Sequence, residues 1–197
     1  DGGAFDNCAN LKTVTFEEGT TEIAEGLFAG CTGIEQITIP DTVTVIESGA
    51  FGGCINLKEI TVPDNVTEIQ RSAFEYCSSL KTAKLSENLK SIGIWAFGDC
   101  NVLKSIKIPD SVTDIDGNAF AECKELSDVI LSKNLKTMGW QVFGNDNKLN
   151  EIEIPKSLEE CRYSVNSAGI DGGAFDNCAN LKTVMFEEGT TEIAEGL

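Results

Sequence analysis

The sequence predicts a repeat solenoid, a stack of similar coils in which each coil contacts only its neighbours. Two observations lead to this fold class. Phenylalanine recurs every 23 residues from Phe5 to Phe143, and cysteine follows three residues after the first six of these phenylalanines, from Cys8 to Cys123. A fixed period of this length is typical of stacked repeats rather than of a domain with one central core. Residues 1–197 are therefore expected to form a single solenoid of about eight coils.

Each coil contains the same three elements, which residues 57–79 illustrate. A first extended segment with alternating apolar residues ends at Pro63, because proline removes a donor from the strand ladder. A second short extended segment and a single helical turn are expected to follow. Eight positions of this coil are expected to face the interior: Leu57, Ile60, Val62, Val66, Ile69, Ala73, Phe74 and Cys77.

A second, longer repeat is superimposed on the coils. Residues 171–197 repeat residues 1–27 with one change, in which Met185 replaces Thr15. The offset is 170 residues, which equals seven coils of 23 residues plus nine extra residues. This arithmetic predicts that each longer unit contains a short insert.

We therefore interpret residues 1–170 as one higher-order unit of seven coils with an insert near 159–169, and residues 171–197 as the start of the next unit. Neither end has the polar coil that normally caps a solenoid. A segment of a much longer array explains this best. The alternative is a short protein whose ends overlap and stack with those of other copies.

The repeated motif L-x-x-I-x-I-P-x-x-V-x-x-I-x-x-x-A-F-x-x-C resembles the leucine-rich repeats of the BspA-like, or Treponema pallidum, type. Leu57, Ile60, Val62-Pro63, Val66, Ile69 and Ala73-Phe74-x-x-Cys77 carry the resemblance. It covers nearly the whole chain except the insert. The resemblance implies a right-handed leucine-rich-repeat superhelix with a parallel β-sheet on its concave side and short strands or helical turns elsewhere. It also implies a secreted or cell-surface protein, often one that acts in adhesion.

Composition excludes several classes of function. The net charge is −17, which disfavours binding to nucleic acid and to anionic membranes. No apolar run is long enough for membrane insertion in this segment. Histidine is absent, so a histidine-based catalytic triad, a Cys–His pair and imidazole metal ligands are all excluded. We expect no enzymatic activity, no cofactor and no metal site.

The outward positions of the first extended segment form rows across the predicted sheet. Lysines are concentrated in the middle of these rows, although the chain as a whole is acidic. One interpretation is a concave surface that binds a protein or glycan ligand. The other is a solvated face whose charges prevent aggregation. The candidate binding residues are Lys58, Thr61, Lys81, Lys84, Lys104, Lys107 and Ile130.

Three aromatic residues are candidate contacts. Trp95 and Trp140 follow the second extended segment at or near outward positions, and Tyr163 lies in the insert. Exposed tryptophans are enriched where proteins bind their partners. Each tryptophan could equally cover the shoulder of its coil against the neighbouring coil, so both interpretations stay open.

The cysteines predict a structural ladder. Parallel side chains at the spacing of stacked strands cannot converge easily to form disulfides, so we expect buried free thiols that fill space. Cys161 lies outside the ladder and is assigned to the insert, where it could link chains, pair with a ladder cysteine or remain a plain loop thiol. The ladder consists of Cys8, Cys31, Cys54, Cys77, Cys100, Cys123 and Cys178.

Two functions fit these features. The first is a non-catalytic, extracellular or cell-surface segment of a longer tandem array that acts in adhesion or protein–protein interaction as a stalk or fibre. The second is a purely structural filament subunit that polymerises end to end with copies of itself through uncapped coils.

Overall fold

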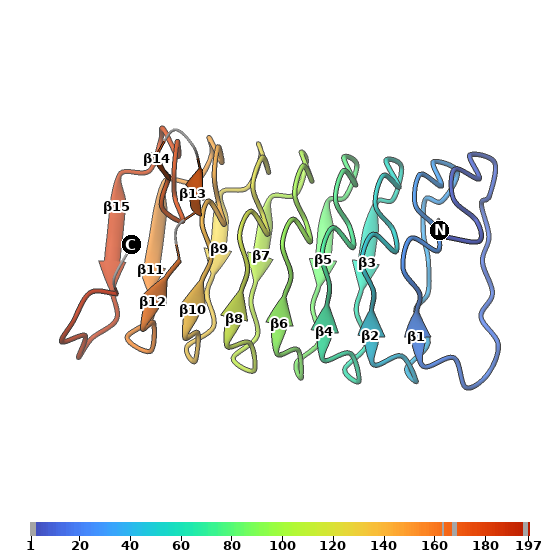
Figure 1. The fold of residues 1–197 in the computed structure, drawn as a ribbon, viewed down its shortest axis with the longest axis horizontal. Coiled ribbons are helices and arrows are strands. Elements are labelled where there is room, and N and C mark those ends of the chain that lie inside the picture. The colour runs from blue at the N-terminus through green and yellow to red at the C-terminus, as the bar shows by residue number, and fades with distance from the viewer. Residues whose placement is uncertain (1–2, 163, 167–168, 195–196) are drawn as a thin grey trace.

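The computed structural model describes residues 3–162, 164–166, 169–194 and 197. The chain forms a solenoid of parallel strands, as the sequence predicts. Figure 1 shows that the coils stack side by side along one axis in chain order, with the N-terminal coil at one end and strand β15 at the other. Each residue therefore lies beside its equivalents in the two neighbouring coils.

The second extended segment of the coil forms the largest sheet, which has seven parallel strands. Neighbouring strands pair at an offset of 23 residues, as Glu22 opposite Val45 shows. The second residue of each strand is buried. In order, the strands are β1 (Glu22–Ile23), β2 (Val45–Ile46), β4 (Glu68–Ile69), β6 (Ser91–Ile92), β8 (Asp114–Ile115), β10 (Thr137–Met138) and β12 (Glu160–Cys161).

The first extended segment forms three separate two-stranded sheets, which lie behind the seven-stranded sheet in Figure 1. The strands are not paired between β5 and β7 or between β9 and β11. Pairing on this face therefore has a period of two coils instead of one. The three pairs are β3 (Glu59–Thr61) with β5 (Thr82–Lys84), β7 (Ser105–Lys107) with β9 (Asp128–Ile130), and β11 (Glu151–Ile154) with β15 (Thr183–Phe186).

Proline follows the first strand of each of these pairs. A residue that precedes proline is restricted to extended conformations. Val62, before Pro63, uses this conformation to donate a backbone hydrogen bond of 2.9 Å to Lys84 in the next coil. Pro40 is not preceded by a strand, so proline alone does not decide which coils pair. The first strand of each pair runs into Pro63, Pro109 or Pro155.

The last segment of the coil consists of tight turns, so the predicted helical turn is wrong, and no helix occurs in the described ranges. Backbone amides here alternate between two directions. The amide of Phe74 donates to Ala96 in the next coil at 2.8 Å, whereas the amide of Glu75 donates to Ser72 in its own coil at 3.1 Å. A helix needs consecutive amides to donate within the same segment. Ser72 and Tyr76 also have positive φ, at 54° and 60°.

The core follows the predicted pattern. The eight inward positions of residues 57–79 are all buried, with exposed fractions of 2% or less. The phenylalanines stack into one column from Phe5 to Phe175, with neighbouring ring centroids 5.1–5.7 Å apart and interplanar angles of 2–16°. These separations lie in the favourable range for offset aromatic pairs.

Stacking continues across the insert. Strand β11 pairs with β15 at an offset of 32 residues, with Glu151 opposite Thr183, and Phe143 stacks on Phe175 with centroids 5.5 Å apart. The offset exceeds the usual 23 residues by nine, which is the length of the extra sequence. The coil that begins at residue 172 therefore adds to the same stack.

The extra residues begin later than the sequence suggests. The amide of Arg162 donates to the Met138 carbonyl at 2.7 Å, as the equivalent amide does in the preceding coils. Residues 159–162 therefore belong to a regular coil, and the non-periodic residues follow them. The described part of the insert is an antiparallel hairpin of β13 (Ser164–Asn166) and β14 (Gly169–Asp171).

Candidate functional site

The residues proposed as a binding surface lie on or beside the strands of the first extended segment. Thr61, Lys84, Lys107 and Ile130 are the last residues of β3, β5, β7 and β9. Lys58, Lys81 and Lys104 lie directly before the first residue of β3, β5 and β7. All seven are exposed, and together they define what we call the strand face.

Electrostatic pairing on the strand face is weak. Lys58 pairs with Glu35, and Lys107 lies 3.7 Å from Glu87, but these side chains keep exposed fractions of 51–64%. Ion pairs this exposed typically contribute less than about 1 kcal/mol. Ile130 is the unusual member of its row because an apolar side chain there is 55% exposed. The charged residues therefore remain available, and Ile130 is an unprotected apolar contact.

Grooves occur at the junctions where the strands do not pair. The groove between β5 and β7 has a volume of about 290 Å³, and both Lys84 and Lys107 line it. The groove between β9 and β11 has a volume of about 270 Å³ and contains Ile130 beside Lys133 and Glu153. The second groove thus combines an apolar wall with charges of both signs. This combination suits a protein ligand better than a strongly charged polymer.

The ladder cysteines from Cys31 to Cys123 are free and buried, whereas Cys8 is exposed and Cys178 is half-buried. The thiol of Cys77 donates a hydrogen bond of 3.3 Å to the Phe51 carbonyl in the preceding coil, and the thiol of Cys178 makes the equivalent bond to Phe143 at 2.9 Å. Burial raises the pKa of Cys54 to about 12. Such thiols hold almost no thiolate at neutral pH, so they are structural and not nucleophilic groups.

Asp146 occupies the ladder position in the seventh coil and is fully buried. Its Oδ1 accepts a hydrogen bond of 2.8 Å from the Cys123 amide, and its Oδ2 has no partner among the described residues. Burial raises the pKa of Asp146 to about 9, with the charge of Glu122 adding to the effect. The group is therefore mainly protonated at neutral pH, as expected for an unpaired carboxyl in the core.

Cys161 does not lie in the insert, which corrects the interpretation from the sequence. It is the second residue of β12 and pairs with Met138 in the seven-stranded sheet. Only 2% of it is exposed, and burial raises its pKa to about 11. Cys161 fills the core position that Ile115 fills two coils earlier. Its burial removes the physical basis for a reactive loop thiol or a link between chains.

Trp95 and Trp140 lie on the turns that follow the seven-stranded sheet, and both are half-buried. A Cβ atom added to Gly117 would lie 2.5 Å from Cδ2 of Trp140, so this indole packs onto the backbone of the preceding coil. Trp140 therefore covers the shoulder of its neighbour and also keeps part of its surface exposed. Tyr163 lies outside the described residues.

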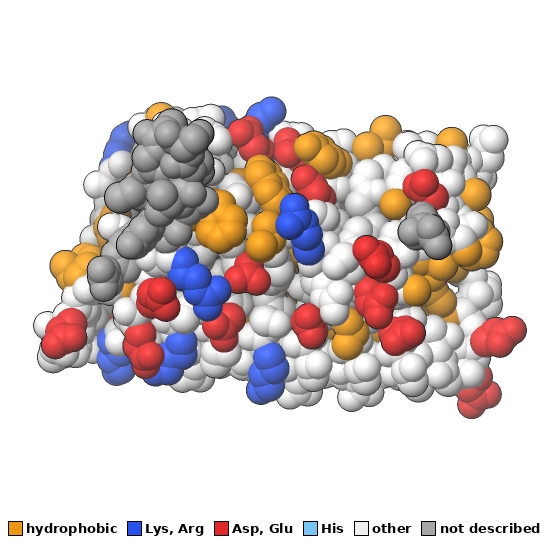
Figure 2. All heavy atoms as spheres, in the orientation of Figure 1, with side chains coloured by type: hydrophobic (Ala, Val, Ile, Leu, Met, Phe, Trp, Pro, Cys, Tyr) orange, Lys and Arg blue, Asp and Glu red, His pale blue; other side chains and the backbone are white. Residues whose placement is uncertain are grey.

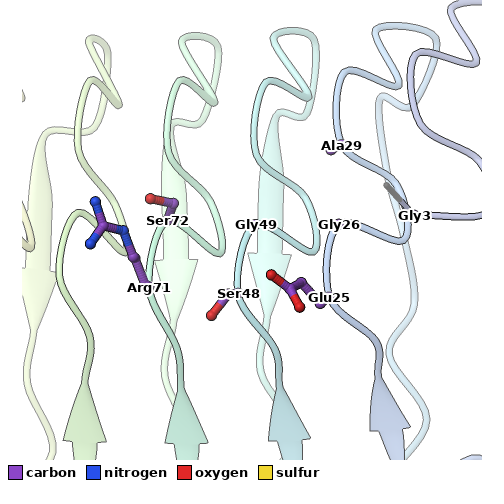
Figure 3. Close-up of a pocket in the computed structure, with 8 residues that line it drawn as sticks. All are labelled: Gly3, Glu25, Gly26, Ala29, Ser48, Gly49, Arg71 and Ser72. Atoms are coloured by element: carbon purple, nitrogen blue, oxygen red, sulfur yellow. The ribbon is translucent and has the colours of Figure 1, made fainter. Parts of the chain in front are cut away.

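The turns also contain a hollow of about 310 Å³ near the N-terminal end. Figure 3 shows that Gly26 and Gly49 of two neighbouring coils line it together with the side chains of Glu25, Ser48 and Arg71. Both glycines have positive φ, at 60° and 65°. Later coils have larger residues at the position of these two glycines. The hollow therefore exists because the glycines have no side chains to fill it.

The described ranges contain no group of three or more His, Cys, Asp or Glu residues able to hold a metal ion. The same residues include no helix with the length and hydropathy that a membrane crossing requires.

Comparison with known families identifies the repeat. The family model for the BspA type leucine-rich repeat region matches residues 1–126, 44–169 and 157–197. The chain belongs to the BspA-type leucine-rich repeat family. The Phe column and the thiol ladder described above are thus how this BspA-type chain stacks its coils. A comparison with curated proteins finds no match.

Solved structures with similar folds come from several bacteria. A leucine-rich repeat protein from Bacteroides ovatus is 34% identical, with a TM-score of 0.75 over 93% of this chain and 44% of that protein. The T. pallidum leucine-rich repeat protein is 31% identical, with a TM-score of 0.65 over 68% of this chain and 65% of that protein. A leucine-rich cell surface protein from Faecalibacterium prausnitzii is 27% identical, with a TM-score of 0.52 over 93% of this chain and 62% of that protein. This chain thus spans less than two thirds of each of these relatives.

The repeat motif does not include the position of Tyr76, so the motif alone does not predict its exposure. Tyr76 is 55% exposed and has a φ of 60°, a backbone conformation that large residues rarely adopt. The signal was present in the sequence, because Gly30 and Gly53 occupy the same position in earlier coils. A periodic glycine marks positive φ, so a tyrosine that replaces it is worth noting.

Proposed function

We propose that this BspA-type chain is a non-catalytic binding segment of a secreted or cell-surface protein, in which the strand face contacts a partner protein or a glycan. The groove that contains Ile130 carries the proposal. An apolar side chain that is 55% exposed between charged residues is the pattern of a contact surface rather than of a solvated face. The similarity to a cell surface protein from Faecalibacterium prausnitzii supports the location.

The strand face also differs from coil to coil, which supports binding over a purely structural role. The row that begins with Thr61 continues through Lys84, Lys107 and Ile130 to Glu153. Core positions remain uniform in the same coils. Selection for stacking alone needs uniform core residues but places no such demand on this outward row, so its variation is available for recognition.

Adhesion of beads coated with the full chain tests this function. The beads are applied to immobilised extracellular matrix proteins and to a glycan array, and the retained fraction is measured under flow. We expect Ile130→Asp to reduce retention at least tenfold. Ile55→Asp, which makes the same change at an exposed apolar residue outside both grooves, is the matched control and should bind normally. If the Ile130→Asp beads were retained as well as beads that carry the unchanged chain, this result would contradict the role of the strand face.

A structural filament is the second candidate, supported by the continuity of the stack across the insert. Strand β15 adds to β11, and its Val184 and Phe186 are 45% and 41% exposed although they continue rows that are buried or half-buried in earlier coils. We propose that a further coil covers them, either from the same array or from another copy. Sedimentation at increasing protein concentration tests association between copies, and a monomer at all concentrations would exclude it.

A further inference from the structure

Three aromatic residues on the turn side of the solenoid each contact one or both of two glycines, Gly98 and Gly117. A Cβ atom on Gly98 would lie 2.3 Å from Cε3 of Trp95, and one on Gly117 would lie 2.5 Å from Cδ2 of Trp140, so each indole packs directly on a glycine. The amide of Tyr76 donates to the Gly98 carbonyl at 2.9 Å, and the amide of Trp95 donates to the Gly117 carbonyl at 3.2 Å. We call Tyr76, Trp95 and Trp140 the aromatic strip.

The aromatic strip presents its rings to solvent. Tyr76 is 55% exposed, and the two indoles are half-buried, each with one side against its glycine. Trp95 and Trp140 belong to coils two apart, which places them about 10 Å from each other along the stack. Figure 2 shows several groups of hydrophobic side chains over the turns that follow β4 to β10, with acidic side chains and a basic side chain among them. The three residues thus lie on the same side of the solenoid, in the coils of Phe74, Phe97 and Phe143.

The backbone conformation disfavours two of the three aromatic residues. Tyr76 and Trp95 have φ angles of 60° and 58°, a left-handed conformation that large side chains disfavour. Glycine fills both positions in the coils of Phe28 and Phe51. Bulky residues in such conformations tend to occur at functional sites, where another requirement outweighs the strain.

Carboxylates line the aromatic strip. Glu75, Asp99 and Glu122 follow one another in successive coils at or next to the position of Tyr76, and no described residue forms an ion pair with them. Burial and the charge of Glu122 raise the pKa of Asp99. The charges of Glu75 and Asp99 likewise raise the pKa of Tyr76. These groups therefore repel one another, and a bound cation would relieve the repulsion.

Few positive charges compete for these carboxylates. Arg162 is already held by Asp116 at 2.9 Å and by Asp114 at 3.5 Å. Lys124 is close enough to lower the pKa of Asp99 in part. Arg71 stands at the other end of the strip, in the coil of Tyr76, and pairs with none of the described residues. The chain as a whole has a net charge of −17.

We propose that the aromatic strip is a second binding surface, which accepts a lysine- or arginine-rich segment of a partner protein. The cationic groups would lie over the exposed rings within about 6 Å, where cation–π attraction is effective. Their charges would be balanced by Glu75, Asp99 and Glu122. This surface lies on the turn side and is independent of the strand face, so its failure would leave the proposed function untouched.

The tryptophans provide a direct test because the chain contains two, and both belong to the strip. The full chain is titrated with a ten-residue peptide of alternating Lys and Gly while tryptophan emission is recorded. We expect a saturable change in emission that weakens at least tenfold between 50 mM and 500 mM salt, because charge pairing drives the contact. A peptide of alternating Glu and Gly should give no change.

Variants separate a built site from general attraction to an acidic chain. Tyr76→Gly keeps every charge and suits the local φ, so it should weaken binding at least fivefold without loss of thermal stability. Asn7→Gly changes the equivalent residue of the first coil, which has a φ of 57°, and should bind normally. Arg71→Ala removes the competing cation and should tighten binding.

Two results would overturn the proposal. Unchanged affinity in Tyr76→Gly would show that the peptide responds only to net charge. A neutral oligosaccharide that changes tryptophan emission, where the lysine peptide does not, would identify the strip as a sugar platform instead.

Discussion

The regular coils and the seventh coil place residues with opposite hydrogen-bonding roles at the same interior position. In the coil of Phe97, the Cys100 thiol donates a hydrogen bond of 3.4 Å to a carbonyl of the preceding coil. In the seventh coil, Asp146 accepts a bond of 2.8 Å from the amide of Cys123. The residue at the ladder position can therefore act either as a hydrogen-bond donor or as a hydrogen-bond acceptor.

The Phe column is the same in both regions. Ring centroids are 5.4 Å apart between Phe97 and Phe120 and 5.7 Å apart between Phe120 and Phe143, although the coil of Phe143 has Asp146 where the other two coils have a cysteine. The column therefore sets the stacking, and the ladder position adjusts to it. This hierarchy can be tested by changes to each part separately.

The largest effect is expected from loss of a ring in the middle of the column. Phe97→Ala should lower the free energy of unfolding by about 3–5 kcal/mol, because it removes a fully buried ring and leaves a cavity between two others. Urea denaturation followed by circular dichroism measures this. Phe5→Ala is the control, since Phe5 is 46% exposed and should cost less than about 1.5 kcal/mol. Equal effects at the two positions would argue against a column that sets the stacking.

An intermediate effect is expected at Asp146, and it depends on pH. The folded-state pKa of about 9 lies above the ordinary value of 3.8, so the folded chain retains a proton that the unfolded chain loses. The contribution of Asp146 to stability is therefore fully present below about pH 4 and is lost as pH rises toward 9. Asp146→Asn removes this titration.

Measurement at two pH values checks the sign. The difference in unfolding free energy, Asp146→Asn minus the unchanged chain, should rise by up to about 4 kcal/mol between pH 5 and pH 8, because each pH unit between the two pKa values changes it by about 1.4 kcal/mol. Asp116→Asn is the control, because Asp116 is partly exposed and paired with Arg162. A difference for Asp146→Asn that is constant with pH would mean that the carboxyl is charged throughout.

The sequence predicts the solenoid, its core and its family because these depend on periodic apolar residues, and a period survives local variation. The sequence predicts a helical turn where the structure has tight turns, because A-F-x-x-C has helical spacing. In the structure, the amides of Phe74 and its equivalents instead donate to the next coil. Such bonds depend on neighbouring coils and leave no local pattern. The sequence places Cys161 in the insert because the residues around it lack the motif, although it lies one period after Met138.

For a similar reason, the sequence predicts more of the strand face than of the grooves or the aromatic strip. The rows of the strand face follow from alternation along a strand, which places Lys84 and Ile130 outward. The grooves beside them depend on which coils pair, and the motif does not determine that. Tyr76 joins the aromatic strip only through contacts made by Gly98, which single-coil reasoning does not reveal.

The smallest effect is expected where the seventh coil meets the insert. Arg162 donates to Asp116 at 2.9 Å and to the Thr137 hydroxyl at 3.0 Å, across two earlier coils. Burial would raise the pKa of Asp114, but hydrogen bonds from Thr137 and Thr113 and the charge of Arg162 outweigh it, so the pKa is lowered. The network thus ties three coils together on the surface.

Arg162→Met should lower the free energy of unfolding by less than about 1 kcal/mol, because its partners are 42–43% exposed and solvent screens the charges. Half a molar salt should abolish most of this difference. Lys136→Met is a matched control, since Lys136 forms a single ion pair with Glu159 on the same side of the coils. If Arg162→Met instead destabilised the chain as strongly as Phe97→Ala, the insert junction and not the Phe column would hold the seventh coil in register.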